Sequence, residues 1–362
     1  MGNDKRLNIA LRYFRVVFSL ILPGIMFILS NTALSQISGQ ILPAEIPPTV
    51  CASSNSIGMG NPIGISIRGR QVKDQLKVET TIQNLTTKPV SGKLEWDLRP
   101  RGKVQINPLV FRDLQPNDAI TTQSGLMAGN KEAALVASVH LENGCHIEKE
   151  IGLMAIPLRL IPPRIDGSLA EWINVPQLHL DKDSQAVKSP SSPLWSKANA
   201  SGAFQFWVTE EAFYIAAYIT DDTPLINPRH GKEIWRGDGI ELFLGLKGPS
   251  DQTYCQDMDF QIGLGPGHKG ALPEMWNGKT QHTIEKGGII SCKTGHGYII
   301  EARIPLSELG NWEPQRQEMI GFDIKLNDLD KNEGDKPALS LIWSGTSENL
   351  SNPSHWGIAI IW

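Results

Sequence analysis

Tryptophans are the residues of this sequence best placed to contact a ligand. The 362-residue chain has 25 aromatic residues, of which ten are Trp, and nine of those ten lie after residue 157. Most of the nine sit in or beside apolar segments, which indicates packing. Trp235 lies instead in the polar stretch 234–238, and Trp276 lies in the turn-rich stretch 273–278. An indole ring in such a position can stack on an apolar ligand face, so both are candidate binding residues.

Glu241 follows Trp235 by six residues, in an apolar strand pattern. It alternates with Ile240 and Leu242, so its carboxylate faces away from those side chains. Two interpretations stay open here. The carboxylate either accepts hydrogen bonds from a ligand or forms a structural hydrogen bond within the fold.

Catalytic motifs are absent from the sequence. It holds no Gly-x-Ser-x-Gly, no His-Glu-x-x-His and no phosphate-binding loop, and its eight histidines are scattered. A glycosidase would need two carboxylates facing each other across a cleft, and we assign no such pair. The net charge of −4 also excludes a general nucleic-acid binder, because there is no basic excess. We therefore expect a protein without a catalytic site.

Acidic residues offer weak candidates for a metal site. Asp328 and Asp330 alternate in a stretch that looks like the start of a calcium-binding loop, although position six of that pattern is Glu333 rather than Gly. Other acidic pairs are 221–222 and 257/259. Solvated loop acids are the alternative interpretation.

The N-terminus predicts export. Residues 1–35 have basic residues first, then an apolar run of about 14 residues, too short to span a bilayer, and then small residues at Ala33 and Ser35. This is typical of a signal peptide, although an uncleaved anchor is an alternative. We expect a periplasmic or secreted protein with no membrane contact after cleavage. In an exported chain, four cysteines favour disulfides but allow three pairings. We predict Cys51–Cys145 and Cys255–Cys292.

Strand patterns fill the rest of the chain, so strands and the turns between them must position the candidate binding and metal residues. Residues 36–50 indicate a linker or lead-in strand, and 51–157 show alternating strands with a hairpin turn at Asn143-Gly144. Residues 158–362 repeat short strand patterns and carry 18 basic and 26 acidic residues, a net charge of −8. We predict an all-β protein with two β-sandwich domains, divided near residue 157.

The order of motifs in residues 160–362 resembles the family 9 carbohydrate-binding modules of secreted xylanases and related proteins. The stretches that carry this resemblance are 164–172, 213–222, 235–244, 297–305, 320–328 and 353–357. The resemblance implies a larger, jelly-roll-like sandwich. The pattern of residues 51–157 resembles the immunoglobulin-like accessory modules of bacterial secreted proteins.

The resemblance also implies residue roles. Trp235 matches a family tryptophan that stacks on a sugar, Glu241 matches its hydroxyl-binding glutamate, and Gln261 stands where the family has an arginine. Leu350 stands near the expected second stacking tryptophan, so Trp276 is the candidate for a second ring. Family members also bind structural calcium, which makes calcium the expected cofactor.

These inferences predict an exported carbohydrate-binding protein whose partner is an oligosaccharide or polysaccharide. It could accompany a glycoside hydrolase, and its N-terminal domain could dock on other cell-envelope proteins. One alternative is a structural or interaction module with a degenerate sugar site. Another is a haem-binding periplasmic subunit, for which Met258, Met275 and His268 are conceivable ligands.

Overall fold

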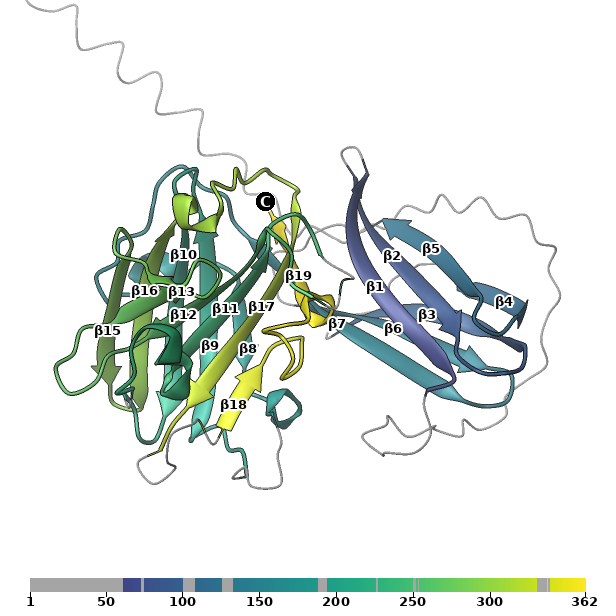
Figure 1. The fold of residues 1–362 in the computed structure, drawn as a ribbon, viewed down its shortest axis with the longest axis horizontal. Helices are drawn as coiled ribbons and strands as arrows, with labels where there is room; N and C mark the ends of the chain where they lie inside the picture. The colour runs from purple at the N-terminus through teal and green to yellow at the C-terminus, as the bar shows by residue number, and fades with distance from the viewer. Residues whose placement is uncertain are drawn as a thin grey trace, which may run out of the picture.

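The fold is described from a computed structural model that covers residues 61–72, 75–99, 108–125, 133–187, 194–225, 227–249, 252, 254–330, 337 and 339–362. The predicted signal peptide (1–35), the predicted linker (36–50) and Cys51 lie outside this range. Within it the chain forms strands and five short 3₁₀-helices, which confirms the all-β prediction (Figure 1). In the same residues no helix combines the length and apolar character needed to span a membrane.

The C-terminal sandwich packs two sheets around a large apolar core. Its five-stranded sheet has the order β15-β16-β10-β9-β8, and its second sheet runs β14-β13-β12-β11-β17-β19, with β18 paired to β17. The bounds of the first sheet are β8 Gln177–Leu180, β9 Ala200–Val208, β10 Ala212–Asp221, β15 Gly288–Thr294 and β16 Gly297–Pro305. Those of the second are β11 Gly239–Gly245, β12 Asp259–Gly265, β13 Glu274–Asn277, β14 His282–Thr283, β17 Met319–Asp328, β18 Leu339–Ile342 and β19 Gly357–Ile361.

The N-terminal sandwich is smaller and also has two layers. Its three-stranded sheet has the order β1-β2-β5, and its other layer has the order β7-β6-β3-β4. The bounds are β1 Ile63–Val72, β2 Gln75–Asn84, β3 Val90–Arg99, β4 Leu109–Leu114, β5 Ala119–Gly125, β6 Ala133–Leu141 and β7 His146–Ile156. The hairpin predicted at Asn143-Gly144 joins β6 to β7, and Gly144 has the positive φ that such a turn requires.

The two sandwiches share one continuous sheet. Strand β19, the last of the chain, pairs in parallel with β7, with Leu153 opposite Ile358. Successive residues of β19 point to opposite faces, so Ile358 and Ile360 enter the N-terminal core while Ala359 and Ile361 enter the C-terminal core. Figure 1 shows β7 and β19 side by side between the two sandwiches. The joint is therefore a buried part of both cores rather than a flexible linker.

Five 3₁₀-helices connect the strands: η1 Ala170–Trp172, η2 Asp183–Gln185, η3 Gly231–Arg236, η4 Leu306–Leu309 and η5 Pro353–His355. Trp172 in η1 is fully buried, and its indole N–H donates to Glu301 Oε1 at 2.8 Å. Trp207, Trp343 and Trp356 are also buried, in line with the packing role expected for most of the nine tryptophans after residue 157.

The disulfide predicted between Cys255 and Cys292 is wrong, because both cysteines are free. Cys255 precedes β12 and is exposed, whereas Cys292 lies on β15 in the opposite sheet. The Cys292 sulfur packs beside Gly167, and the Cys255 thiol donates to the carbonyl oxygen of Leu350 at 3.3 Å. Cys145 is buried, and its pairing with Cys51 stays a prediction because Cys51 is outside the described residues.

Candidate functional site

Glu241 lies at the centre of the outward face of the second C-terminal sheet. The strand register places Gly263 on one side of it and Lys325 on the other, and Trp276 lies one strand beyond Gly263. Residues directly opposite each other share a face, so Trp276, Glu241 and Lys325 line one row. Gln261, two residues from Gly263 along β12, lies on the same face. The four residues predicted from the sequence to bind a ligand include three that this register brings together: Glu241, Gln261 and Trp276.

The Glu241 carboxylate organises the polar floor of this surface. It is 5% exposed and accepts hydrogen bonds from Gln261 Nε2 at 2.5 Å, Lys325 Nζ at 2.9 Å and Asn327 Nδ2 at 2.8 Å. A carboxylate has about four lone-pair sites, so three donors nearly saturate it. Glu241 therefore holds the Gln261 amide and the Lys325 ammonium in fixed orientations, and both polar groups retain further hydrogen-bonding capacity.

Helix η3 forms one wall of the surface and carries Trp235. Its Ile234 side chain packs directly over Gly263 and Gly265, where an added Cβ would lie 2.6 and 2.8 Å from Ile234 atoms. Those two positions therefore require glycine for this close approach. Asn227 Nδ2 donates to the carbonyl oxygens of Ile234 and Asp238, at 2.8 Å each, and fixes both ends of the turn.

Trp235 itself is half-buried and lies outside the hydrophobic core. The Arg236 guanidinium lies 5.5 Å from its ring centre, and Arg236 Nε pairs with Glu233 at 2.7 Å. Trp276 is also half-buried, and its ring packs against Gly231 at the start of η3. Both tryptophans are thus associated with η3, at the border of the floor that Glu241 organises.

The segment 344–352 forms the wall at the other end of the floor. Buried Asp323 anchors it by accepting hydrogen bonds from the backbone N–H groups of Ser344 and Gly345, at 3.2 and 2.6 Å. Burial raises the pKa of Asp323 to about 7, although these hydrogen bonds oppose the shift. Trp356 packs on Phe243 of β11 and donates to the carbonyl oxygen of Asn349 at 3.0 Å.

Leu350 in this wall is 62% exposed, as expected for a residue that faces solvent beside a binding surface. Tyr254, which the sequence patterns did not single out, is 61% exposed next to Cys255, whose thiol contacts Leu350. A single tyrosine in a loop shows no periodic pattern in the sequence. Tyr254 is recognised as a residue near this wall only because its neighbour Cys255 contacts Leu350.

Five aspartates gather at a different place, where β10 and β17 end and β11 begins. Asp221, Asp238 and Asp328 are buried, with one carboxylate oxygen of each within 4.8 Å of the others. Asp222 and Asp330 form a second such group with Asp221. Burial raises the pKa of Asp221 to about 6, and repulsion from Asp330 and Asp222 adds to the shift. The candidates Asp328 and Asp330 thus belong to one acidic cluster.

This cluster consists of hard oxygen donors, the ligand chemistry that Ca²⁺ prefers. Backbone N–H groups orient two of its members: Thr223 donates to Asp221 at 2.6 Å and Leu329 donates to Asp238 at 2.7 Å. The residues present therefore fit a calcium ion. Asp259, in contrast, accepts a hydrogen bond from Gln256 N at 2.7 Å and lies outside the cluster.

The residues considered as haem ligands, Met258, Met275 and His268, make packing or hydrogen-bond contacts within the fold. Met275 is 1% exposed within the C-terminal core, and Met258 packs against the same core. His268 Nδ1 lies 2.9 Å from the carbonyl oxygen of Leu225.

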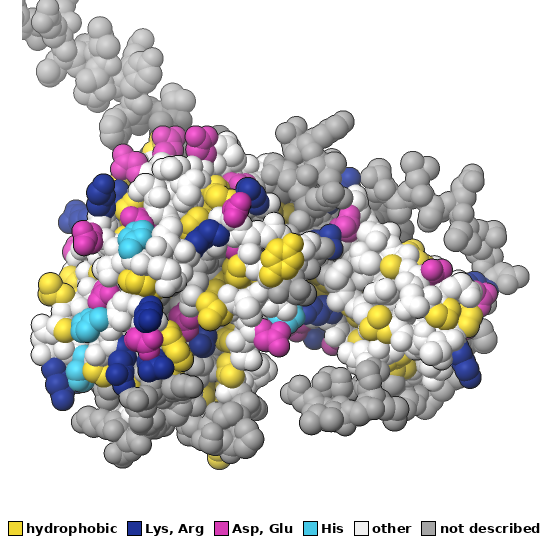
Figure 2. All heavy atoms as spheres, in the orientation of Figure 1, with side chains coloured by type: hydrophobic (Ala, Val, Ile, Leu, Met, Phe, Trp, Pro, Cys, Tyr) yellow, Lys and Arg dark blue, Asp and Glu magenta, His cyan; other side chains and the backbone are white. Residues whose placement is uncertain are grey.

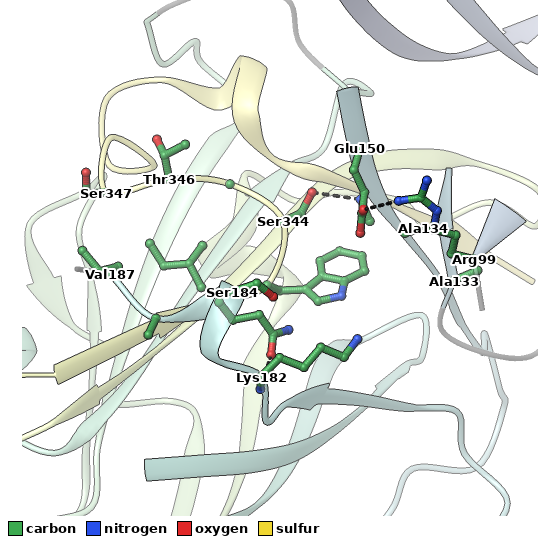
Figure 3. Close-up of a pocket in the computed structure, with 16 residues that line it drawn as sticks. Arg99, Ala133, Ala134, Glu150, Lys182, Ser184, Val187, Ser344, Thr346 and Ser347 are labelled. Carbon is green, nitrogen blue, oxygen red and sulfur yellow. Dashed lines mark hydrogen bonds and ion pairs between the residues drawn. The ribbon is translucent and has the colours of Figure 1, made fainter. Parts of the chain in front are cut away.

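A cleft of about 740 Å³ lies in the corner between the two sandwiches (Figure 3). Its floor is the indole of Trp343, which packs on Gly152 and Gly357. Ser344 Oγ accepts a hydrogen bond from Gly152 N at 2.9 Å, and Arg99 lies 3.7 Å from Glu150. The Gly152–Ser344 hydrogen bond and the packing of Trp343 on Gly152 join β7 to the C-terminal sandwich, so the corner belongs to the structural joint.

The charges on the face seen in Figure 2 do not favour a strongly charged ligand. Over the C-terminal sandwich, Lys and Arg side chains lie next to Asp and Glu side chains, with apolar side chains between them. Such a mixed surface suits a polar, uncharged ligand with apolar patches.

Comparisons with known proteins give a family match for the C-terminal sandwich. Residues 165–362 match the family described as carbohydrate family 9 binding domain-like. Among solved structures, the chain is similar to a carbohydrate-binding module of family 9 from Caldicellulosiruptor kristjanssonii. The complex with glucose is 18% identical with a TM-score of 0.44, covering 57% of this chain and 95% of that one. The complex with cellotriose is 19% identical with a TM-score of 0.43, covering 57% and 93%. No curated protein sequence matches the chain significantly.

Proposed function

The chain belongs to the carbohydrate family 9 binding domain-like family, and we propose that the surface around Glu241 binds a carbohydrate. The observation that carries this proposal is the shared outward face of Glu241, Gln261, Lys325 and Trp276, with Trp235 on the adjoining helix η3. The family module structures similar to this chain contain glucose or cellotriose, so glucose-based oligosaccharides are the first ligands to test.

The chemistry of the surface matches that of a pyranose. A sugar ring has apolar C–H faces, which stack on an indole, and a rim of hydroxyls, which need hydrogen-bond partners. Trp235 and Trp276 supply indoles, while the Gln261 amide and the Lys325 ammonium supply polar groups at the floor. Because Glu241 already holds these two groups, little side-chain entropy is lost when a ligand binds them.

We propose that the acidic cluster of Asp221, Asp222, Asp238, Asp328 and Asp330 holds a structural calcium ion. A bound cation would neutralise carboxylates that otherwise repel one another across β10, β11 and β17. Asp238 lies three residues before Glu241 on the same chain segment, so an ordered cluster supports the start of β11.

We also propose that residues 1–35 act as a signal peptide and that the protein works in the periplasm or outside the cell. A basic start, a short apolar run and small residues near Ser35 support this. The N-terminal sandwich then fixes the position of the sugar-binding sandwich, because the two share a sheet. Docking on cell-envelope proteins and an association with a glycoside hydrolase remain proposals.

Calorimetric titration with glucose, cellotriose and a panel of other oligosaccharides tests the proposed function. We expect binding by the wild-type protein and a loss of at least about tenfold in affinity for Trp235→Ala, because a stacked tryptophan is typically a major binding contact. Trp362→Ala is the matched control: Trp362 is 42% exposed at the chain end, and its loss should leave affinity unchanged.

Leu350 favours a second candidate function, an interaction module with a degenerate sugar site. Its exposed aliphatic side chain stands where the family resemblance leads one to expect an aromatic ring. Absence of binding across the whole panel, together with identical behaviour of wild type and Trp235→Ala, would favour this second function.

Calcium removal gives a further prediction. At about pH 7.5, adding calcium to EDTA-treated protein should raise Tm by roughly 3–5 °C, the effect of a ligand at about 100 times its Kd on a chain of this size that unfolds in one transition. Scanning calorimetry would measure the shift. It should shrink at about pH 5, because Asp221, with a pKa of about 6, is then protonated and protons compete with the cation.

For the calcium-free protein, the contribution of Asp221 to stability changes with pH in the opposite direction. The folded pKa of Asp221 lies above its unfolded value, so its contribution to stability is complete below about pH 4 and is lost as the pH rises through about 6. Asp238→Asn should abolish the calcium shift, whereas Asp257→Asn, in an exposed loop outside the cluster, should preserve it. An unchanged shift in Asp238→Asn would contradict the assignment.

A further inference from the structure

A small pocket of about 190 Å³ lies where the two sandwiches meet, outside the sugar site and separate from the corner cleft. Strands β1 and β7 of the N-terminal sandwich and helix η5 of the C-terminal sandwich supply its walls. Three of the side chains that line it are basic: Arg68 on β1, Lys149 on β7 and His355 on η5. The pocket therefore collects basic side chains from three separate elements.

Lys149 occupies an unusual position for a lysine. It alternates along β7 with Ile147 and Ile151, so it belongs to the strand face that packs into the N-terminal core. Both isoleucines are buried, whereas Lys149 is half-buried and lines the pocket. Burial lowers the pKa of Lys149, because it withdraws the ammonium group from water. An apolar residue at this position would pack in the core without that cost.

No counter-charge for Lys149 lies among the described residues, with none of which it forms an ion pair or a hydrogen bond. Glu150 is the one acidic residue that lines the pocket. Successive residues of a strand point to opposite faces, and Glu150 pairs on the outward face with Arg99 at 3.7 Å. A half-buried ammonium group without a partner is destabilising, so an anion bound in the pocket would offset that cost.

Arg68 and Ser66 add hydrogen-bond donors from another wall of the pocket. Both lie on β1, which is an edge strand of its sheet. Glu79 stands directly opposite Arg68 in the register of β1 and β2, but a guanidinium has five N–H donors, more than one carboxylate uses. The Ser66 hydroxyl makes no hydrogen bond to a described residue. In a pocket of this size, an anion beside Lys149 also lies within reach of these donors.

His355 forms a third wall and is held by the C-terminal sandwich. Its Nδ1 lies 3.0 Å from Thr346 Oγ1 and 4.0 Å from Glu348 Oε2, and its Nε2 lies 3.5 Å from Asn352 Nδ2. Burial and the neighbouring Lys149 lower the pKa of His355, which outweighs the opposing effect of Glu348. The imidazole is therefore neutral at about pH 7.5, and the two other basic side chains carry the positive charge of the pocket.

We propose that Lys149 and Arg68, with the Ser66 hydroxyl, bind an oxyanion: a phosphate, a sulfate or the carboxylate of an acidic sugar. These groups share one recognition chemistry, since their oxygens accept charge-assisted hydrogen bonds from cationic N–H donors. Sites for whole small molecules usually exceed about 300 Å³, so a pocket of about 190 Å³ fits a single anionic group. The bound anion would lie between β1, β7 and η5, at the joint of the two sandwiches.

The test is calorimetric titration of the full-length protein with sodium phosphate, sodium sulfate and sodium glucuronate, in a chloride buffer of constant ionic strength. We expect one bound anion per chain for at least one of the three salts. Binding of phosphate or sulfate identifies a free anion as the ligand, and binding of glucuronate alone identifies a sugar carboxylate. Lys149→Met should weaken that binding by at least about tenfold, because it removes the charge-assisted hydrogen bond of the ammonium group.

Two controls accompany the Lys149→Met variant. Methionine suits a position between Ile147 and Ile151, so the variant should fold, with a Tm in chloride buffer equal to or above that of wild type. Lys286→Met makes the same change at an exposed lysine before β15 and should leave anion affinity unchanged. Both variants should bind cellotriose like wild type, which keeps this test independent of the sugar site. Wild-type protein that binds none of the three anions, or equal anion affinity in Lys149→Met and wild type, would overturn the proposal.

Discussion

Glu241→Gln is expected to lower sugar affinity by at least about tenfold while leaving the fold intact. Glutamine keeps the shape of glutamate but turns one acceptor into a donor. The three groups that now donate to Glu241 are Gln261, Lys325 and Asn327, at 2.5, 2.9 and 2.8 Å. After the substitution the new amide would face two amide donors and a lysine that has lost its counter-charge. Gln261 and Lys325 then lose the orientation in which they meet a sugar.

Calorimetric titration with cellotriose, together with thermal unfolding, measures both halves of this prediction. Glu318→Gln is the matched control, because Glu318 is a half-buried glutamate that accepts from Trp312 Nε1 at 3.2 Å and from Gln315 N at 2.9 Å. Glu318→Gln should lower the free energy of unfolding but leave the affinity for cellotriose unchanged. Equal affinity of Glu241→Gln and wild type would show that Glu241 has only a structural role.

Ile358→Ala is expected to destabilise both sandwiches together, by about 2–5 kcal/mol. Ile358 is fully buried on β19, pairs with Leu153 of β7, and packs in the N-terminal core although it belongs to the C-terminal sandwich. The cavity therefore forms at the strand pair that both cores share. The two sandwiches should melt in one cooperative transition, in contrast to domains joined only by a linker.

Hydrogen exchange measured segment by segment distinguishes one cooperative unit from two sandwiches that unfold independently. In Ile358→Ala, protection should fall both in β3 and β6 and in β11 and β16. Leu94→Ala is the comparison variant, since Leu94 is equally buried in the N-terminal core but lies on β3, away from the joint. In one cooperative unit its loss of stability should also lower protection in β11 and β16. Full protection of β11 and β16 in Ile358→Ala would contradict a shared, cooperative sheet.

Most strands of the C-terminal sandwich are predictable from the sequence because they are apolar and bounded by turn residues. The patterns at 213–220, 239–246 and 319–327 correspond to β10, β11 and β17. Short edge strands such as β8 and β14 have too few residues to show a period. The pairing of β19 with β7 was also missed, because register between distant strands leaves no local signal.

The candidate site is predictable in part. Glu241 and Trp276 could be named from the sequence and Gln261 from the family resemblance, and the register places all three on one face. The acidic cluster is a different case, since Asp238 is not among the metal-ligand candidates that the sequence indicates. Its burial with Asp221 and Asp328 depends on the ends of three separate strands meeting. The prediction of a Cys255–Cys292 disulfide failed for the same reason, because spacing along the chain does not show which sheet a cysteine occupies.

A crystal structure of the full-length protein with cellotriose would show directly whether the surface around Glu241 binds a sugar. We expect a sugar ring stacked on Trp235 or Trp276, with hydroxyls within hydrogen-bond distance of Gln261 and Lys325 on the floor that Glu241 organises. A sugar bound elsewhere, such as the corner cleft beside Trp343, or crystals that exclude cellotriose while this face is open to solvent, would contradict it.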